Sequence, residues 1–245
     1  MLRLIPRLDI KNKNLIKTIN MEGLRKIGDP NIFAKEYSES GADELLLMDV
    51  VASLYDRNNL FEVINIISKD IFIPITVGGG VRSVEDARKL LNNGSDKVAI
   101  NSAALKNSFL ISELANHIGS CSIVLSIEAK KISNDWYAFS NCGRDNSGKK
   151  VIDWLKQAVR LGVGEVILTS IDKEGTESGF DLDLLKSLAQ LNINFPLIIS
   201  GGIRNISDID MARKILNISG VSLASVLHYK KITINEIKKD LNILK

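Results

Sequence analysis

The sequence has few of the residues that mark metal, redox or disulfide-rich proteins. Its 245 residues include only two cysteines and two histidines. Cys121 and Cys142 have no CxxC spacing, so we expect no disulfide framework and a reduced, cytoplasmic setting. His117 and His228 have no Cys or Asp cluster at ligand spacing, so no zinc site is expected.

Strong charge and long apolar runs are also missing. The net charge is only +3, and the basic residues are not interleaved with aromatic ones, which argues against nucleic-acid binding. No run approaches the ~18 apolar residues of a membrane span, and the charged start MLRLIPRLDIK does not fit a signal peptide. No linker divides the chain, so we expect a single domain over residues 1–245, a usual length for an α/β barrel.

The chain instead alternates between short apolar or β-branched runs and amphipathic segments of helical period. The runs predict strands over 4–10, 44–50, 71–77, 97–100, 122–128, 165–170, 195–200 and 221–226. Eight β–α alternations predict a parallel sheet closed into a (βα)8 TIM barrel, whereas the alternative, a doubly wound open sheet, would use fewer strands. The connections 11–28 and 129–149 are long, and long loops in compact domains tend to be functional.

An internal repeat divides the chain into two similar (βα)4 halves. FIPITVGGGVRSVEDARKLL in the first half matches NFPLIISGGIRNISDIDMARKIL in the second, apart from a small insertion, and LDIK matches IEAK. Asp9 therefore corresponds to Glu128. Because strands one and five lie opposite each other in a closed barrel, we expect these carboxylates to face each other across the C-terminal mouth, where barrel active sites lie.

Glycine pairs follow the third and seventh expected strands. Such pairs leave backbone N–H groups open to an anion, and the next helix N-terminus adds a favourable dipole. Alternatively, they are only tight-turn glycines. Because the pairs are in repeat register, we expect a ligand with a phosphate at each end. The first phosphate site comprises Gly79, Gly80, Asn101 and Ser102, and the second comprises Ser200, Gly201, Gly202, Ala224 and Ser225.

The charged residues near the strand ends have a structural and a functional interpretation. Asp9 and Glu128 can be caps or salt-bridge partners, but opposed between two anion sites they suit a general acid and a general base. Further carboxylates at this rim, expected to hold some of its lysines, are Asp49, Asp172 and Glu174, and the lysines are Lys11, Lys17, Lys130 and Lys173. At the opposite end, surface charges or a self-paired ring on the barrel axis are expected from Arg3, Glu44, Lys97 and Glu165.

With these features, the sequence resembles the HisF family, the cyclase subunits of imidazole glycerol phosphate synthase. The resemblance runs from about Leu2 to Lys239 and is carried by IPRLDIK, GDP, GADELLLMDVVAS, TVGGGVRS, DKVAINSAA, SIEAK, LTSIDKEGT, SGG and LASVLHY. It implies that ammonia converts a bis-phosphate ribulosyl aminoimidazole compound (PRFAR) to imidazole glycerol phosphate and an aminoimidazole carboxamide ribotide (AICAR), in histidine biosynthesis and without a cofactor. It also implies a HisH-like glutaminase at the barrel bottom, with the four basal charges as the gate for its ammonia. The site residues that match the family are Asp9, Lys17, Asp49, Asn101, Thr169 and Ser200.

Three positions depart from the family pattern. A second catalytic aspartate of the family is Glu128 here, an aspartate after strand six is Glu174, and a small residue, usually cysteine, is Arg7. Glu128→Asp is expected to raise activity if only the reach of the side chain is at fault. By strand alternation, Arg7 points into the barrel beside Asp9. We expect it to pair with Glu128 or Asp49, because an unpaired buried guanidinium is costly.

Two other functions stay open. The same features fit HisF paralogues that relay ammonia from their own glutaminase to a sugar amidotransferase, in acetamidino-sugar and surface-polysaccharide pathways. RLDIK, VASLYDRNN, SIEAK and LHY fit that branch. A sugar isomerase built on the same half-barrel repeat fits the basal charges and LTSIDKEGT less well. We favour the cyclase, because Asp9 and both phosphate sites remain and a glutamate can still transfer protons.

Overall fold

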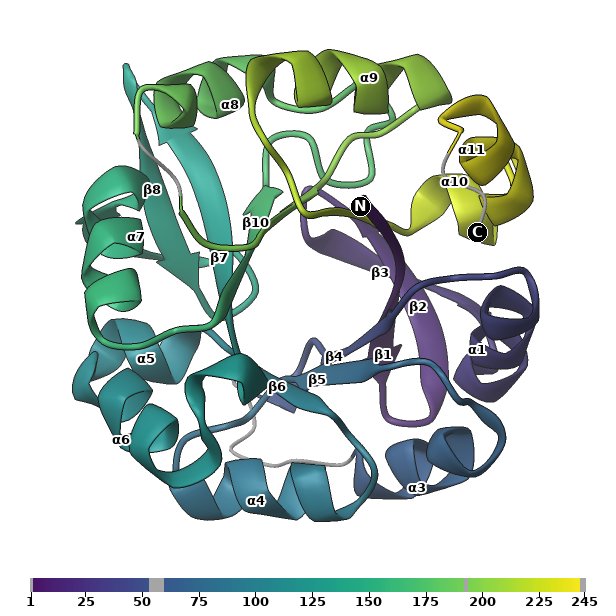
Figure 1. Ribbon diagram of the computed structural model, residues 1–245, viewed down its shortest axis with the longest axis horizontal. Helices are drawn as coiled ribbons and strands as arrows, with labels where there is room; N and C mark the ends of the chain where they lie inside the picture. The colour runs from purple at the N-terminus through teal and green to yellow at the C-terminus, as the bar shows by residue number, and fades with distance from the viewer. Residues whose placement is uncertain (1, 53–59, 192–193, 243–245) are drawn as a thin grey trace.

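Parallel strands form a closed barrel at the centre of the molecule, with helices outside it (Figure 1). The computed structural model describes residues 2–52, 60–191 and 194–242. Within these residues the barrel consists of eight strands, in order β1 (Arg3–Lys11), β4 (Leu45–Asp49), β5 (Ile75–Gly78), β6 (Lys97–Ile100), β7 (Ile123–Ile132), β10 (Glu165–Ser170), β11 (Leu197–Ser200) and β12 (Gly220–Leu223). The ring closes because β12 pairs with β1, with Arg3 opposite Gly220. The predicted (βα)8 TIM barrel is confirmed.

The helices cover the outside of the strands. They are α1 (Pro30–Glu39), α3 (Phe61–Asp70), α4 (Val84–Asn92), α5 (Ser102–Lys106), α6 (Phe109–Ile118), α7 (Val151–Arg160), α8 (Leu182–Ala189), α9 (Ile206–Ile215), α10 (Ser225–His228) and α11 (Ile234–Asp240), with a 3-10 turn at Ser120–Ser122. Helix α7 shows why they lie there. Its buried residues Val151, Trp154, Leu155 and Ala158 follow the spacing of a single helix face, which packs against the barrel.

Of the predicted strands, only 97–100 and 165–170 have the same limits in the structure, and two of the others show why the limits move. The strand predicted over 71–77 begins only at Ile75, because Ile71 is still the C-cap of α3 and its N–H donates to the Ile67 carbonyl. The strand predicted over 221–226 ends at Leu223, because α10 begins at Ser225. Part of the VASLYDRNN stretch, residues 53–59, lies outside the described residues.

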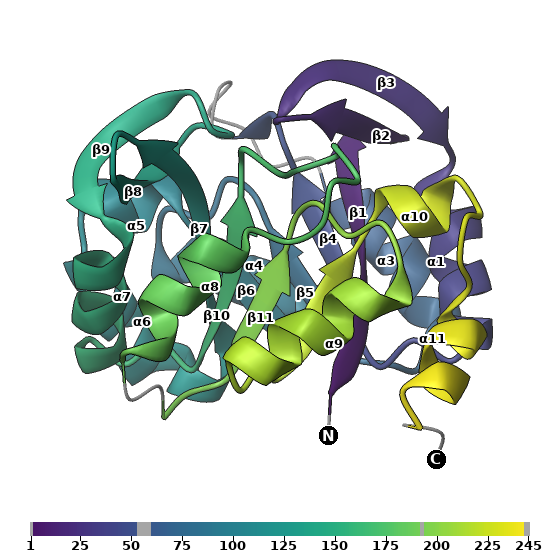
Figure 2. The ribbon, with the colours of Figure 1, turned by 90° about the horizontal axis from the view of Figure 1, so that it is seen from above.

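The two long connections are β-hairpins and not irregular loops. The first consists of β2 (Asn14–Ile19) and β3 (Glu22–Gly28), and the second of β8 (Asp135–Ser140) and β9 (Asp145–Lys150). Strands β2 and β8 continue β1 and β7 as antiparallel partners, with Asp9 opposite Ile16 and Glu128 opposite Phe139. Both hairpins lie at one end of the barrel, and the chain termini lie at the other (Figure 2). The two candidate carboxylates therefore lie where the barrel strands pass into the hairpins.

The barrel interior is layered along its axis. A small apolar cluster inside the barrel is separate from the larger core between strands and helices, and consists of Ile5, Leu46, Met48, Ala99, Val124, Ile167 and Ile198. On β1 the side chains on the face opposite to Leu4 and Leu8 point into the barrel. From the bottom to the mouth they are Arg3, Ile5, Arg7 and Asp9, and they contribute to the successive layers. The axis thus passes from charged side chains at the bottom, through an apolar layer, to buried charges at the mouth.

The internal repeat is also a repeat in three dimensions. The Arg82 N–H donates to the Asp86 carboxylate over 3.0 Å, and the Arg204 N–H donates to Asp208 over the same 3.0 Å. A Cβ at Gly79 would lie 2.4 Å from the Asp49 carbonyl oxygen, and a Cβ at Gly201 would lie 2.8 Å from that of Ser170. Both glycines therefore let a strand end pass close to the strand before it, which supports the tight-turn interpretation without excluding an anion site.

Candidate active site

A buried arginine crosses the barrel interior near the mouth. Arg7 Nε donates to Asp9 Oδ1 over 2.7 Å, and Arg7 Nη1 donates to Thr169 Oγ1 over 3.3 Å. All three residues are buried. Because β1 and β10 are separated by β11 and β12, this side chain spans the space inside the barrel.

The predicted partner of Arg7 was wrong. The guanidinium forms its ion pair with Asp9, and neither Glu128 nor Asp49 bonds to it. Arg7 and Asp9 are two residues apart on one strand, so their side chains leave the same face next to each other. Asp49 instead accepts 3.0 Å hydrogen bonds from the N–H groups of Val51 and Ala52.

Arg7 determines the ionisation of Asp9. Burial alone would raise the pKa of Asp9, but the positive charges of Arg7 and Lys17 outweigh burial and lower it below the ordinary value. Burial likewise acts to lower the pKa of Arg7, while Asp9 and Glu174 raise it above the ordinary value. At neutral pH this pair is therefore a guanidinium and a carboxylate.

Glu128 shifts in the opposite direction. Its side chain is buried, and its Oε2 accepts a 2.8 Å hydrogen bond from the Gly143 N–H. Burial raises the pKa of Glu128 to about 7, against the opposing effects of Arg7 and the Gly143 bond. The mouth therefore holds two carboxyl groups whose pKa values lie on opposite sides of the ordinary value, the arrangement that acid–base chemistry requires.

A buried ion pair anchors the first hairpin over the site. Lys17 of β2 donates to Glu174, which follows β10, and both side chains are buried. Nearby, the Asn20 N–H donates to the Glu174 carbonyl over 2.7 Å, and Asn20 Nδ2 donates to the Ile171 carbonyl over 2.8 Å. The expectation that rim carboxylates hold lysines is met here by Glu174, while Asp172 accepts from the Lys131 backbone N–H at 2.8 Å.

The second predicted phosphate site forms one hollow. All five of its residues line the hollow, together with Glu174, Gly175, Glu177, Ile203 and Ser222. The buried Ser222 Oγ has no hydrogen-bond partner among the described residues. The two carboxylates in the wall are already paired, Glu174 with Lys17 and Glu177 with Lys231.

Two residues of the first predicted phosphate site bond to the second hairpin. Asn101 Nδ2 donates to the Phe139 carbonyl over 3.0 Å, and Ser102 Oγ accepts from the Asn141 N–H over 3.0 Å. Gly79 and Gly80 have φ values of +105° and +75°. The two sites, equivalent in sequence, therefore differ in their contacts: the first bonds to the second hairpin, and the second lines the hollow.

Several residues near the mouth were not found from the sequence. Asn141, Cys142 and Gly143 form the turn of the second hairpin with three successive positive φ values of 52°, 56° and 76°. Cys142 Sγ donates to the Val50 carbonyl over 2.7 Å, and burial raises the pKa of its thiol to about 12. The only sequence signal was the Asn-Cys-Gly turn composition in the long connection.

Another missed group is a buried histidine. His228 Nδ1 lies 2.7 Å from the Tyr37 hydroxyl. Burial lowers the pKa of His228 to about 4, so the ring is neutral at pH 7. His228 of α10 also stacks on Tyr37 of α1. This contact holds α10, which begins at the second predicted phosphate site, against α1.

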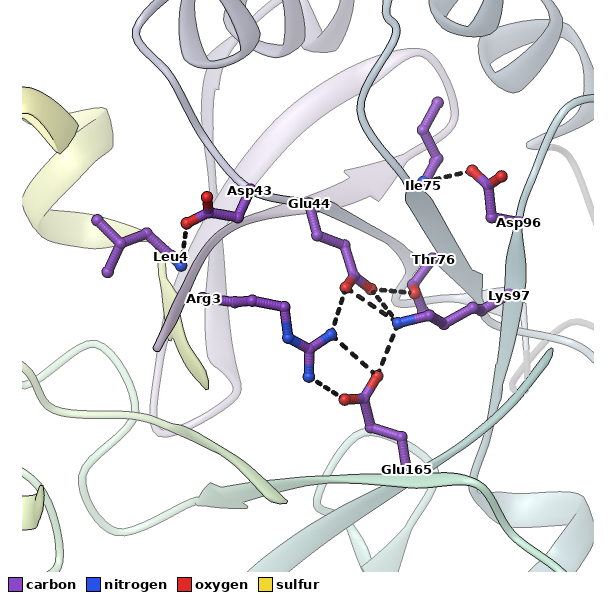
Figure 3. Close-up of polar contacts among 9 residues, drawn as sticks. All are labelled: Arg3, Leu4, Asp43, Glu44, Ile75, Thr76, Asp96, Lys97 and Glu165. Carbon is purple, nitrogen blue, oxygen red and sulfur yellow. Dashed lines mark hydrogen bonds and ion pairs between the residues drawn. The ribbon is translucent and has the colours of Figure 1, made fainter. Parts of the chain in front are cut away.

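The basal charges form a ring on the barrel axis (Figure 3). Arg3 Nη1 donates to Glu44 over 2.7 Å and also pairs with Glu165. Lys97 Nζ lies 3.0 Å from Glu44 and 2.8 Å from Glu165. The structure thus brings the four residues together as a self-paired ring, in which two cations balance two carboxylates.

Thr76 belongs to this ring and was missed in the sequence. Its Oγ1 donates to Glu44 Oε1 over 2.5 Å. Within the ring, burial alone would raise the pKa of Glu165, but its bonds to Arg3 and Lys97 lower it. Burial would also lower the pKa of Arg3, which Glu165 and Glu44 raise instead.

Across residues 2–52, 60–191 and 194–242, no group of three or more His, Cys, Asp and Glu side chains is arranged to hold a metal ion. In the same part of the chain, no helix has the length and apolar character to cross a membrane.

Known proteins resemble the chain over most of its length. A family model described as histidine biosynthesis protein matches residues 3–233. The imidazole glycerol phosphate synthase subunit HisF of Legionella pneumophila is 52% identical over 207 residues, which are 84% of this chain and 97% of that protein. The HisF subunit of Helicobacter hepaticus is 43% identical over 238 residues, 96% and 93% of the two chains. That of Streptococcus gordonii is 41% identical over 238 residues, 97% and 94% of the two chains.

Proposed function

The chain belongs to the histidine biosynthesis protein family, and from this we propose that it is a HisF-type cyclase/lyase subunit of imidazole glycerol phosphate synthase. The reaction is the ammonia-dependent conversion of PRFAR to imidazole glycerol phosphate and AICAR. The observation that carries the proposal is the pair Asp9 and Glu128, whose pKa values are shifted in opposite directions at the mouth where the two phosphate sites are predicted.

The substrate of this reaction has a phosphate at each end, and the two phosphate sites are proposed to bind them. The hollow around Gly201 and Gly202 is proposed to bind one phosphate, through backbone N–H groups. The other phosphate is proposed to bind at Gly80 and Ser102. There it replaces the Asn141 N–H of the second hairpin as the hydrogen-bond partner of Ser102 Oγ. Lys17, Asp49, Asn101, Thr169 and Ser200 are proposed to line the space between them.

Proton transfer at the centre falls to the two carboxyl groups. Addition of ammonia and ring closure require that one proton leave a nitrogen and that another reach the departing group. A carboxylate beside a neutral carboxyl group supplies both functions without a cofactor. At pH values between the pKa of Asp9 and the pKa of Glu128, Asp9 is the carboxylate and Glu128 is the neutral carboxyl group.

The source of ammonia is proposed to be a HisH-like glutaminase bound at the bottom of the barrel. The ring of Arg3, Glu44, Lys97 and Glu165 lies at this end and carries no net charge. Because the four charges pair with one another, opening the ring breaks no ion pair to any other described residue. This property suits a gate. We place this complex, like the pathway it serves, in the cytoplasm.

The test is turnover by the purified chain with PRFAR and a high ammonium concentration. The expected result is loss of PRFAR, followed optically, with imidazole glycerol phosphate and AICAR formed in equal amounts. A folded protein that binds PRFAR without converting it would overturn the cyclase assignment. That outcome would favour a paralogue that passes ammonia to a sugar amidotransferase.

A further inference from the structure

Arg7 is a buried charge at the mouth that the proposed reaction does not itself require. Its side chain is 5% exposed, yet it enters the barrel between the apolar layer and the two carboxyl groups. A guanidinium at this depth is costly unless its donors are used. Nε is used by Asp9 at 2.7 Å, and Nη1 is used by Thr169 at 3.3 Å.

The contacts are unequal for the two carboxyl groups. Asp9 has the direct ion pair with Arg7. Glu128 has no ion pair in the described structure, and its carboxylate is bonded to the Gly143 backbone N–H. Asp9 and Glu128 occupy equivalent positions in the two halves of the repeat, but among the described residues Arg7 forms its direct ion pair with Asp9 alone.

We propose that Arg7 is a positioning residue that holds Asp9 as the carboxylate, so that Asp9 accepts protons and Glu128 donates them. This inference rests on the proposed cyclase function. The side chain of Arg7 bonds to Asp9 and Thr169, which belong neither to the phosphate sites nor to the ring at the barrel bottom, so it acts through Asp9. The second hydrogen bond, to Thr169, holds the guanidinium from the other side of the barrel. The guanidinium therefore stays beside Asp9 when the substrate binds.

Other charges also face Asp9, and they set what removal of Arg7 can do. Lys17 of β2 and His228 of α10 lower the pKa of Asp9, but less than Arg7 does. The acidic or thiol groups in the same electrostatic neighbourhood are Glu128, Glu174 and Cys142. Without Arg7, burial and these groups act against ionisation, with Lys17 as the main remaining cation. The pKa of Asp9 should therefore rise.

The decisive measurement is the titration of Asp9 itself, which does not depend on activity. Carboxyl carbon-13 NMR follows the wild type and Arg7→Met, with the Asp9 signal identified by its absence in Asp9→Asn. The midpoint should move up by about 1 to 3 pH units in Arg7→Met, the usual effect of one adjacent charge. Arg7→Lys should restore a low midpoint. An unchanged midpoint in Arg7→Met would refute the role of Arg7.

The pH profile of kcat/KM with ammonium is the second readout. Its acid limb should move up with the Asp9 midpoint in Arg7→Met and return in Arg7→Lys. Lys238→Met is a matched control, because it removes a buried cation that pairs with Asp43 at 2.8 Å away from the mouth, and its acid limb should stay in place. If Arg7→Met does not fold, Arg7→Gln gives the same test, since it keeps a donor and loses the charge.

The two proposals fail in different ways. An inactive wild type contradicts the cyclase function, whatever Asp9 does. An active wild type whose acid limb and Asp9 midpoint are both insensitive to Arg7→Met contradicts only the role of Arg7.

Discussion

The Glu128 carboxylate accepts a 2.8 Å hydrogen bond from the backbone N–H of Gly143, which joins the end of β7 to the turn of the second hairpin. The turn itself is bound to Val50 through Cys142 and to Ser102 through Asn141. The position of Gly143 is thus fixed from β7, from Val50 after β4 and from Ser102 at the start of α5, and a glutamate has the length that reaches it. The departure at Glu128 belongs to a site built around the longer side chain.

Glu128→Asp should therefore lower the rate of the cyclase reaction. The shorter side chain loses the Gly143 bond and moves the carboxyl group by roughly 1 Å, which can cost about 10²-fold. Side-chain reach considered alone predicts the opposite, a gain. The measurement is kcat with ammonium, with the exposed Glu113→Asp as the control for the same chemical change. A rise in kcat would mean that Glu128 is only a misfit.

Glu128→Gln should remove a pH dependence of stability. In the wild type the pKa of Glu128 is raised from 4.5 to about 7, so the folded state binds more protons than the unfolded state between these values. The free energy of unfolding then falls as pH rises through this window, by on the order of 3 kcal/mol. Urea unfolding at several pH values between 4.5 and 8 should show this fall in the difference between the wild type and Glu128→Gln, in which the opposite contribution of the buried His228 cancels. Equal slopes in both proteins would show that Glu128 ionises normally.

Glu165→Gln should damage the basal ring and the delivery of ammonia. It leaves Arg3 and Lys97 with Glu44 as their only carboxylate in the ring, and we expect a loss of about 1–3 kcal/mol in unfolding free energy. With a glutaminase partner, glutamine-dependent turnover should fall more than ammonium-dependent turnover. Asp183→Asn, which breaks only the exposed pair with Lys186, should change neither. An equal fall in both rates would argue against a gate.

Gly202→Ala should impair the second phosphate site more than it impairs the fold elsewhere. Gly202 has φ +95°, and a Cβ there would lie 2.3 Å from the Gly179 carbonyl oxygen. Gly41 has φ +86° with open space around it, so Gly41→Ala isolates the conformational strain of about 1–2 kcal/mol. Only Gly202→Ala should also raise KM for PRFAR, by about tenfold for one lost charge-assisted hydrogen bond. The same KM in both variants would remove this loop from phosphate binding.

The barrel and much of the site could be predicted because their signals are local or repeated. Strand runs, glycine pairs and the match of Asp9 to Glu128 are all visible as short motifs in register. The charges of the basal ring were predictable because four strands begin with residues whose signs balance. The part of Thr76 in the ring was not predictable, because threonine is a common strand residue and nothing in the sequence distinguishes Thr76 from its neighbours.

What the sequence could not supply was the choice among neighbours. The expected partner of Arg7 was Glu128 or Asp49, and only the side-chain packing assigns Arg7 to Asp9. The two hairpins were predicted as loops because β3 and β9 are polar and mostly exposed, and so carry little apolar alternation. The bonds of the second hairpin to Asn101 and Ser102 depend on those strands and could not be predicted either.

The most direct test of the central claim compares the wild type with Asp9→Asn in ammonium-dependent conversion of PRFAR. Asn keeps the shape of Asp9 but cannot accept a proton. The account predicts turnover to both products by the wild type and a loss of about 10² to 10⁴ in kcat for Asp9→Asn, with PRFAR still bound. Equal rates in the two proteins, or no turnover by a folded wild type that binds PRFAR, would contradict it.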